Sequence, residues 1–147
     1  MKFAVSELKA LSGAVRSLSA REGPGLSALL YRRQGDFFEI IEEVGMDPRC
    51  VRAHRFCTMF CALAFGYAER AAGCRLPRYP RDAIQETAGF MARGEEGQIG
   101  RRACGYRKRI LRHVLIHDDF DEDDTEWLCT MISAFLFLVE KSLGGKR

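Results

Sequence analysis

Residues 56–68 read Phe-Cys-Thr-Met-Phe-Cys-Ala-Leu-Ala-Phe-Gly-Tyr-Ala, and no side chain in this run is charged. A helix that is apolar on nearly every side has to be buried. Asp47 and Pro48 precede the run and Gly73 follows it, and these residue types favour a helix start and a helix end. The sequence therefore predicts a long central helix over about 47–73, with the rest of the chain packed around it.

Two amphipathic helices are expected before the central one. Apolar residues recur at helical spacing over 3–20, and the triplet Gly23-Pro24-Gly25 then interrupts the pattern. The second helix is expected over 26–44, and Gly45 is placed to end it. Gly35 lies inside this second helix, at a cost of up to about 1 kcal/mol relative to Ala.

Three further helices are expected after the central one. Pro77 and Pro80 bound a short connector, and the glycines at 94, 97 and 100 predict a flexible joint. Asp123 and Glu126 stand three residues apart, as in a capping box. Helices are therefore expected over 82–93, over 101–117 and from 123 to 144.

The composition and the hydrophobic pattern favour one all-α domain. The chain has 147 residues, 47% of them hydrophobic, which suffices for one packed core. No stretch alternates with period two, so the expected fold is a single globular bundle over residues 1–147, with about six to eight helices around the apolar central helix. The uncharged runs 56–68 and 127–139 are shorter than the roughly 20 residues of a membrane span. No secretion signal opens the chain, so reduced thiols are expected.

Cysteine and histidine positions do not predict a metal site. Three cysteines and one histidine fall on one face of the central helix: Cys50, His54, Cys57 and Cys61. One straight helix cannot arrange four ligands around one ion, so buried free thiols are expected instead. His113 and His117 are one turn apart but lack the glutamate pattern of zinc hydrolases. No nucleophile with a positioned base is apparent, so neither an enzyme nor a cofactor is expected.

The basic segment 101–112 leaves an alternative function open. It contains six cations and no acid: Arg101, Arg102, Arg107, Lys108, Arg109 and Arg112. Such a helix could face nucleic acid or act as a regulatory module, and its binding would then weaken steeply with salt. However, the acidic block 118–126 follows it, and the net charge of the chain is only +3. The expected main function therefore involves no nucleic acid.

Three segments resemble motifs of a known family. Residues 31–38, Tyr-Arg-Arg-Gln-Gly-Asp-Phe-Phe, resemble the third Bcl homology motif of the Bcl-2 family, with Tyr31, Gly35 and Asp36 at its marked positions. In that motif the glycine lets a neighbouring helix approach closely, and the aspartate is placed to pair with a basic group. The central run 56–68 resembles the first homology motif continuing into the family's apolar helix, and Trp127 lies in a segment similar to the start of the second motif.

The resemblance implies a pro-survival inhibitor of apoptosis, similar to the divergent viral members of the family. Such a protein sequesters the death-motif helix of pro-apoptotic partners in a hydrophobic groove. The groove is expected between the second helix and the central helix, and its expected residues are Phe38, Ile41, Arg52, Arg55, Phe56, Met59, Phe60 and Leu63. Arg55 is the expected partner of the ligand's acid, with Arg52 and Arg101 as alternatives. The implied location is the host cytoplasm or the mitochondrial surface. Contact with a membrane is expected only through a hydrophobic tail of the kind usual in the family, and a homodimer is left open.

Overall fold

The computed structural model describes residues 2–45, 48–93 and 101–144, and within these ranges it contains helices and no strand. The expectation of an all-α fold is therefore confirmed. The α-helices are α1 (Val5–Arg16), α2 (Glu22–Arg33), α3 (Gly35–Gly45), α4 (Val51–Ala72), α5 (Arg81–Arg93), α6 (Arg101–Val114) and α7 (Glu122–Gly144). Short 3-10 turns, η1 (Pro48–Cys50) and η2 (Leu115–Asp118), precede α4 and follow α6. The joint expected at 94–100 lies outside the described residues.

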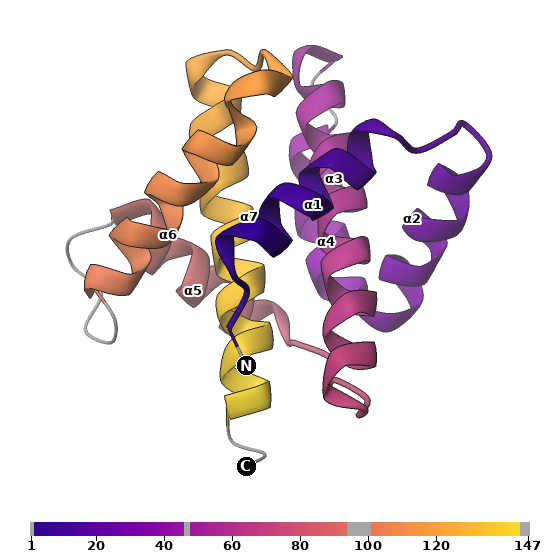
Figure 1. Cartoon of the computed structure of the whole chain (residues 1–147), viewed down its shortest axis with the longest axis vertical. Coiled ribbons are helices and arrows are strands. Elements are labelled where there is room, and N and C mark those ends of the chain that lie inside the picture. Colours follow the sequence, from indigo (N-terminus) through magenta and orange to yellow (C-terminus); the bar gives the residue numbers. More distant parts are fainter. Residues whose placement is uncertain (1, 46–47, 94–100, 145–147) are drawn as a thin grey trace.

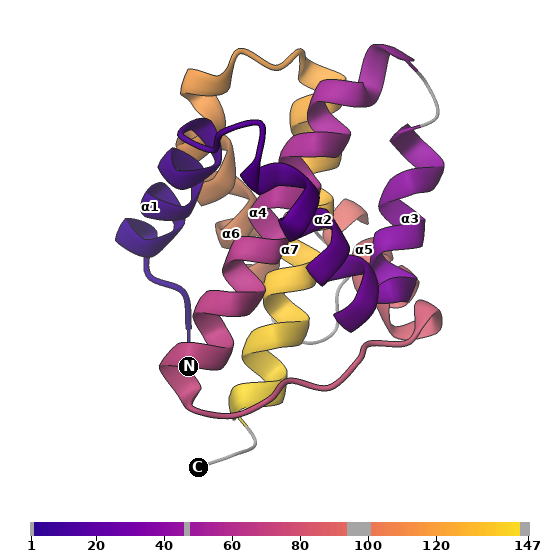
Figure 2. The ribbon, with the colours of Figure 1, turned by 90° about the vertical axis from the view of Figure 1, so that its right-hand side faces the viewer.

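Helix α4 is the expected central helix, and it packs against α1, α2, α3 and α7. Its middle is buried on nearly every side, with Phe60 and Cys61 fully inaccessible to solvent. It ends at Gly73, which adopts the left-handed conformation (φ +64°) that favours glycine after a helix. Figure 1 shows α4 alongside α7, and Figure 2 shows α1 and α3 on opposite sides of α4.

Helix α7 is a second core helix, as the uncharged run 127–139 indicates. Ile132, Phe135 and Val139 are fully buried. The Phe135 ring lies 4.7 Å from that of Phe37 on α3 and 6.4 Å from that of Phe65 on α4, measured between centroids. By length and composition α7 could also cross a membrane, but 67% of its most apolar window is buried inside the fold. That burial is what a core helix requires.

The prediction of one helix over 26–44 is wrong, because the chain forms two helices there. Gln34 leaves the helical conformation (φ −138°, ψ 57°), and Gly35 begins α3. The Gln34 side chain is fully buried. It donates from Nε2 to the Pro77 carbonyl (2.7 Å) and accepts at Oε1 from the Tyr79 amide (3.0 Å). The connector after α4 thus supplies partners that hold the break in place.

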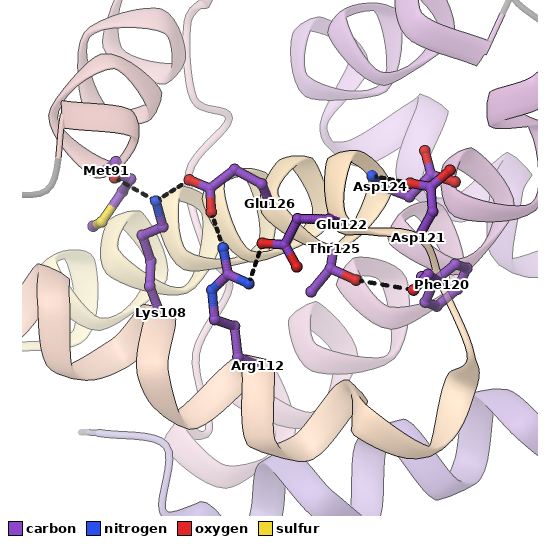
Figure 3. Close-up of polar contacts among 9 residues, drawn as sticks. All are labelled: Met91, Lys108, Arg112, Phe120, Asp121, Glu122, Asp124, Thr125 and Glu126. Carbon is purple, nitrogen blue, oxygen red and sulfur yellow. Dashed lines mark hydrogen bonds and ion pairs between the residues drawn. The ribbon is translucent and has the colours of Figure 1, made fainter.

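Two helix starts also differ from the expectation. Helix α2 begins at Glu22, so residues 23–25 form its first turn rather than a linker. The first amides of a helix need no partner within it, so Pro24 is tolerated there. Helix α7 is capped by Asp121, whose Oδ1 accepts from the Asp124 amide at 2.7 Å, and not by Asp123 (Figure 3). Glu126 cannot complete the expected capping box because its carboxylate is bonded to α6.

Candidate functional site

A cleft of about 410 Å³ lies at the amino end of α4. It is bounded by the carboxy end of α1, the first three turns of α4 and the turn between η2 and α7. The turn before α7 and the start of α4 lie at the same end of the molecule (Figure 1). The cleft therefore combines three segments that are far apart in the sequence.

Apolar side chains make up most of the cleft wall: Val15, Leu18, Phe56, Met59 and Phe120. Phe56 and Met59 are only 7% and 4% exposed, so the cleft lies directly over the hydrophobic core. The Phe56 ring meets the Phe120 ring edge-on, with centroids 5.4 Å apart. An apolar wall of this kind binds apolar side chains or the hydrophobic part of a ligand.

Four charged residues surround this wall: Arg16, Arg52, Arg55 and Asp118. Arg16 donates from Nη1 to both carboxylate oxygens of Asp118, at 3.0 and 3.2 Å. Arg52 donates to the Asp118 carbonyl, and its guanidinium lies 4.2 Å from the centroid of the Phe120 ring. Three guanidinium groups and one carboxylate leave an excess of two positive charges, to which the amino end of the α4 dipole adds.

Arg55 differs from the other two arginines of the cleft. It is exposed, and it makes no hydrogen bond or ion pair with any residue that the structure describes. Arg16 and Arg52 are already bonded to residue 118. An anionic group that enters the cleft could therefore bind Arg55 without breaking a bond to another described residue, whereas Arg16 and Arg52 would first have to release residue 118.

The structure brings together four of the eight residues expected to form a groove. Arg52, Arg55, Phe56 and Met59 line the cleft. The other four are placed elsewhere: Phe60 and Ile41 are fully buried in the core, Leu63 is half-buried against it, and Phe38 packs edge-on against Tyr31 with centroids 5.4 Å apart. The wall opposite α4 is supplied by α1 and the turn before α7, and not by α3. The side chain of Arg101, the third candidate, is not among those that the structure describes.

Sequence reasoning missed the contributions of α1 and of the acidic block. Val15, Arg16 and Leu18 read only as the end of an amphipathic helix. Asp118 and Phe120 read only as part of the acidic block 118–126. One signal was available, because Phe120 is the single aromatic residue between the acids of 118–124 and would be an unusual choice for a fully solvated turn.

The Gly-Asp motif has a different role from the one the resemblance implies. A Cβ atom at Gly35 would overlap the Arg78 guanidinium, so the glycine accommodates a connector side chain and not a neighbouring helix. Asp36 accepts a hydrogen bond from the backbone amide of Arg81 at 3.0 Å and thereby caps α5. Tyr31 is exposed on α2, and Trp127 packs partly buried against the core.

The described part of the basic segment is largely neutralised by α7. Arg107 pairs with Glu140, and the two side chains are only 14% and 10% exposed. Lys108 pairs with Glu126, and Arg112 reaches both Glu122 and Glu126 (Figure 3). The hydrogen bond from Lys108 is the main cause that lowers the pKa of the Glu126 carboxyl. This face of α6 joins two helices and offers few free charges to a nucleic acid.

None of the five cysteines whose side chains the structure describes lines the cleft, and three of them are buried. Burial raises the pKa of Cys61 well above its usual value and raises that of Cys129 to about 11. Both therefore stay as unreactive thiols at neutral pH. Within the described residues, no group of three or more histidine, cysteine, aspartate or glutamate side chains could hold a metal ion. His54 instead faces Glu42, with Nε2 and Oε1 3.6 Å apart.

Comparison with known proteins identified no relative of this chain. No protein-family model, no curated protein and no solved structure matches the chain.

Proposed function

We propose that this chain is a binding protein whose cleft receives one face of an acidic amphipathic helix from a partner protein. The observation that carries the proposal is the exposed Arg55 beside an apolar cleft whose other two arginines are already bonded. No catalytic step is part of the proposal.

A helix fits this combination of an apolar wall and a cationic rim. Amphipathic helices insert apolar anchors at positions i, i+3 or i+4 and i+7, and one charge pair sets the register. The cleft presents Phe56 and Met59 to such anchors, and Arg55 lies one turn from Met59 on the same helix. An acidic residue next to the anchors would reach Arg55 while its apolar neighbours pack on the cleft wall.

The resemblance to the Bcl-2 family supports a specific class of partner. On that resemblance the bound helix is the death motif of a pro-apoptotic protein, and the chain acts as a pro-survival regulator in the cytoplasm or at the mitochondrial surface. The cleft lies on the α1 side of α4, whereas the groove expected from the motifs lay toward α3. We therefore assign the contact surface to the cleft residues and not to Phe38 or Ile41.

The nucleic-acid alternative has less support. Arg107, Lys108 and Arg112 are each bonded to carboxylates of α7, so binding a phosphate backbone would require these pairs to be broken.

Titration of fluorescent peptides onto the full chain tests the proposal. The panel contains several death-motif helices, one unrelated acidic amphipathic helix, a scrambled sequence and a short duplex DNA. The helices are expected to bind in the micromolar range, with weak salt dependence. If no helix binds at tens of micromolar, the proposal fails. If the unrelated acidic helix binds and the death motifs do not, the cleft assignment stands and the apoptotic partner class fails.

Substitution of the cleft arginine localises the binding. Arg55→Glu is expected to weaken helix binding by about 1.5–3 kcal/mol, the worth of a charge-assisted bond in a partly desolvated site. Arg109→Glu makes the same charge change at an exposed position on α6 and serves as the matched control. Phe38→Ala is expected to leave the affinity unchanged. Equal losses in the two arginine variants would show that only the overall charge matters.

A further inference from the structure

The turn that leads into α7 covers part of the cleft with its own side chains. The Phe120 ring lies against Phe56, and the Asp118 carboxylate is bonded to Arg16. We propose that residues 118–120 are an internal pseudo-ligand, which occupies part of the cleft and has to move aside before a partner helix binds fully. This inference concerns the regulation of the site in the proposed function and rests on it.

The turn offers the same chemistry that the proposed ligand would offer. Phe120 is an aromatic anchor, with the Phe56 ring edge-on to it and the Arg52 guanidinium over it, 4.2 Å from its centroid. Asp118 is an acid two residues away, and its side chain is only 6% exposed. An apolar group and a carboxylate at close spacing are what the cleft wall and rim are suited to bind.

The backbone of this segment is suited to a local rearrangement. Asp119 has φ +53° and is the one non-glycine residue with positive φ in the described chain. Asp119 lies between the end of η2 and Asp121, the residue that caps α7. The turn is fastened to α7 at its far end by the Asp121 cap and by the Thr125 hydroxyl, which donates to the Phe120 carbonyl at 3.5 Å (Figure 3). A backbone change at Asp119 would therefore displace Asp118, the last residue of η2, and the Phe120 ring, while the Asp121 cap keeps the start of α7 formed.

The contacts that hold the turn over the cleft come from side chains of other helices. Arg16 of α1 is 43% exposed, so its pair with Asp118 is partly screened by water. Arg52 of α4 supplies the hydrogen bond to the Asp118 carbonyl and the contact with the Phe120 ring. A ligand that offers its own acid and its own aromatic or aliphatic anchor can replace each of these contacts. Its apparent dissociation constant is then raised by the reciprocal of the fraction of molecules in which the turn is open.

Two probes and two variants of the full chain test the proposal. One probe is the tightest helix from the peptide panel. The other is anilinonaphthalene sulfonate, an anionic aromatic dye that needs no partner protein. Phe120→Ala removes the internal anchor and is expected to tighten both probes by about 3- to 10-fold, as for a site that is open in roughly 10–30% of molecules. Asp118→Asn is expected to tighten both in the same direction.

Matched controls separate the opened cleft from general loosening or a charge effect. Phe38→Ala removes a half-buried ring with the same edge-on partner distance of 5.4 Å, away from the cleft. Asp123→Asn makes the same charge change at an exposed position on α7. Near-ultraviolet circular dichroism of each variant checks that the side-chain packing is retained. The quantity compared is the gain in probe affinity of each cleft variant relative to that of its control.

The outcomes distinguish this inference from the proposed function. Tighter dye binding by Phe120→Ala than by Phe38→Ala supports the internal pseudo-ligand, even if no peptide binds and the helix partner fails. Unchanged or weaker dye binding by Phe120→Ala overturns it, because Phe120 is then part of the binding wall. Equal effects of Asp118→Asn and Asp123→Asn would overturn the part assigned to Asp118.

Discussion

Gln34→Ala should show how strongly one buried amide holds the break between α2 and α3. Gln34 is fully buried and bridges to the connector, with Nε2 2.7 Å from the Pro77 carbonyl and Oε1 3.0 Å from the Tyr79 amide. Alanine removes both bonds and leaves a gap in the core. The α2–α3 corner and the connector would then be tied together only by their remaining contacts.

The expected loss of stability follows from the surroundings of each partner. Tyr79 is only 5% exposed, so its amide would stay unpaired at a cost of about 1–3 kcal/mol. Pro77 is exposed, so its carbonyl can bind water and adds little. The missing side-chain atoms add about 1 kcal/mol of lost packing. The total is about 3 kcal/mol, which for a chain of this size lowers the melting temperature by roughly 6–12 °C.

Equilibrium unfolding in urea measures this loss. Helix content can be followed by circular dichroism, and tertiary structure by the fluorescence of Trp127, the one tryptophan of the chain. Gln85→Ala removes the same side chain from an exposed position on α5 and is expected to change stability by less than about 0.5 kcal/mol. A loss for Gln34→Ala no larger than for Gln85→Ala would refute the reasoning, since the Tyr79 amide would then have found another partner.

Two further predictions concern glycine and pH. Gly35→Ala is expected to change the free energy of unfolding by less than about 1 kcal/mol, because only the flexible end of Arg78 has to move. Gly73→Ala is expected to destabilise the fold by about 1–2 kcal/mol, because Gly73 has φ +64°. Thermal melts of the two variants compare these effects. Burial raises the pKa of Glu69, but hydrogen bonds from Arg33 and a backbone amide outweigh it and hold the pKa below the ordinary 4.5. Stability from ionised Glu69 is therefore complete above pH 4.5 and is lost as the pH falls through the lower folded-state pKa. Glu69→Gln should flatten this acid limb in urea melts at stepped pH, and an unchanged limb would contradict the assignment.

The sequence by itself determined the helical class, the central helix and most of the helix ends. These features depend on interactions within one or two turns: apolar residues at helical spacing, a left-handed glycine after α4, and proline residues in the connector before α5. Such interactions join residues that are close in the chain, so the pattern of residue types is enough to predict them.

Only the tertiary structure decided the break at Gln34, the cap of α7 and the composition of the cleft. Gln34 bonds to residues 43 and 45 positions away, and Glu126 is withdrawn from its expected cap by Lys108 and Arg112. The cleft depends on the pairing of Arg16 with Asp118, which are 102 residues apart. The physical reason is that a polar side chain takes whichever partner the packed fold brings within reach, and local sequence does not contain that partner.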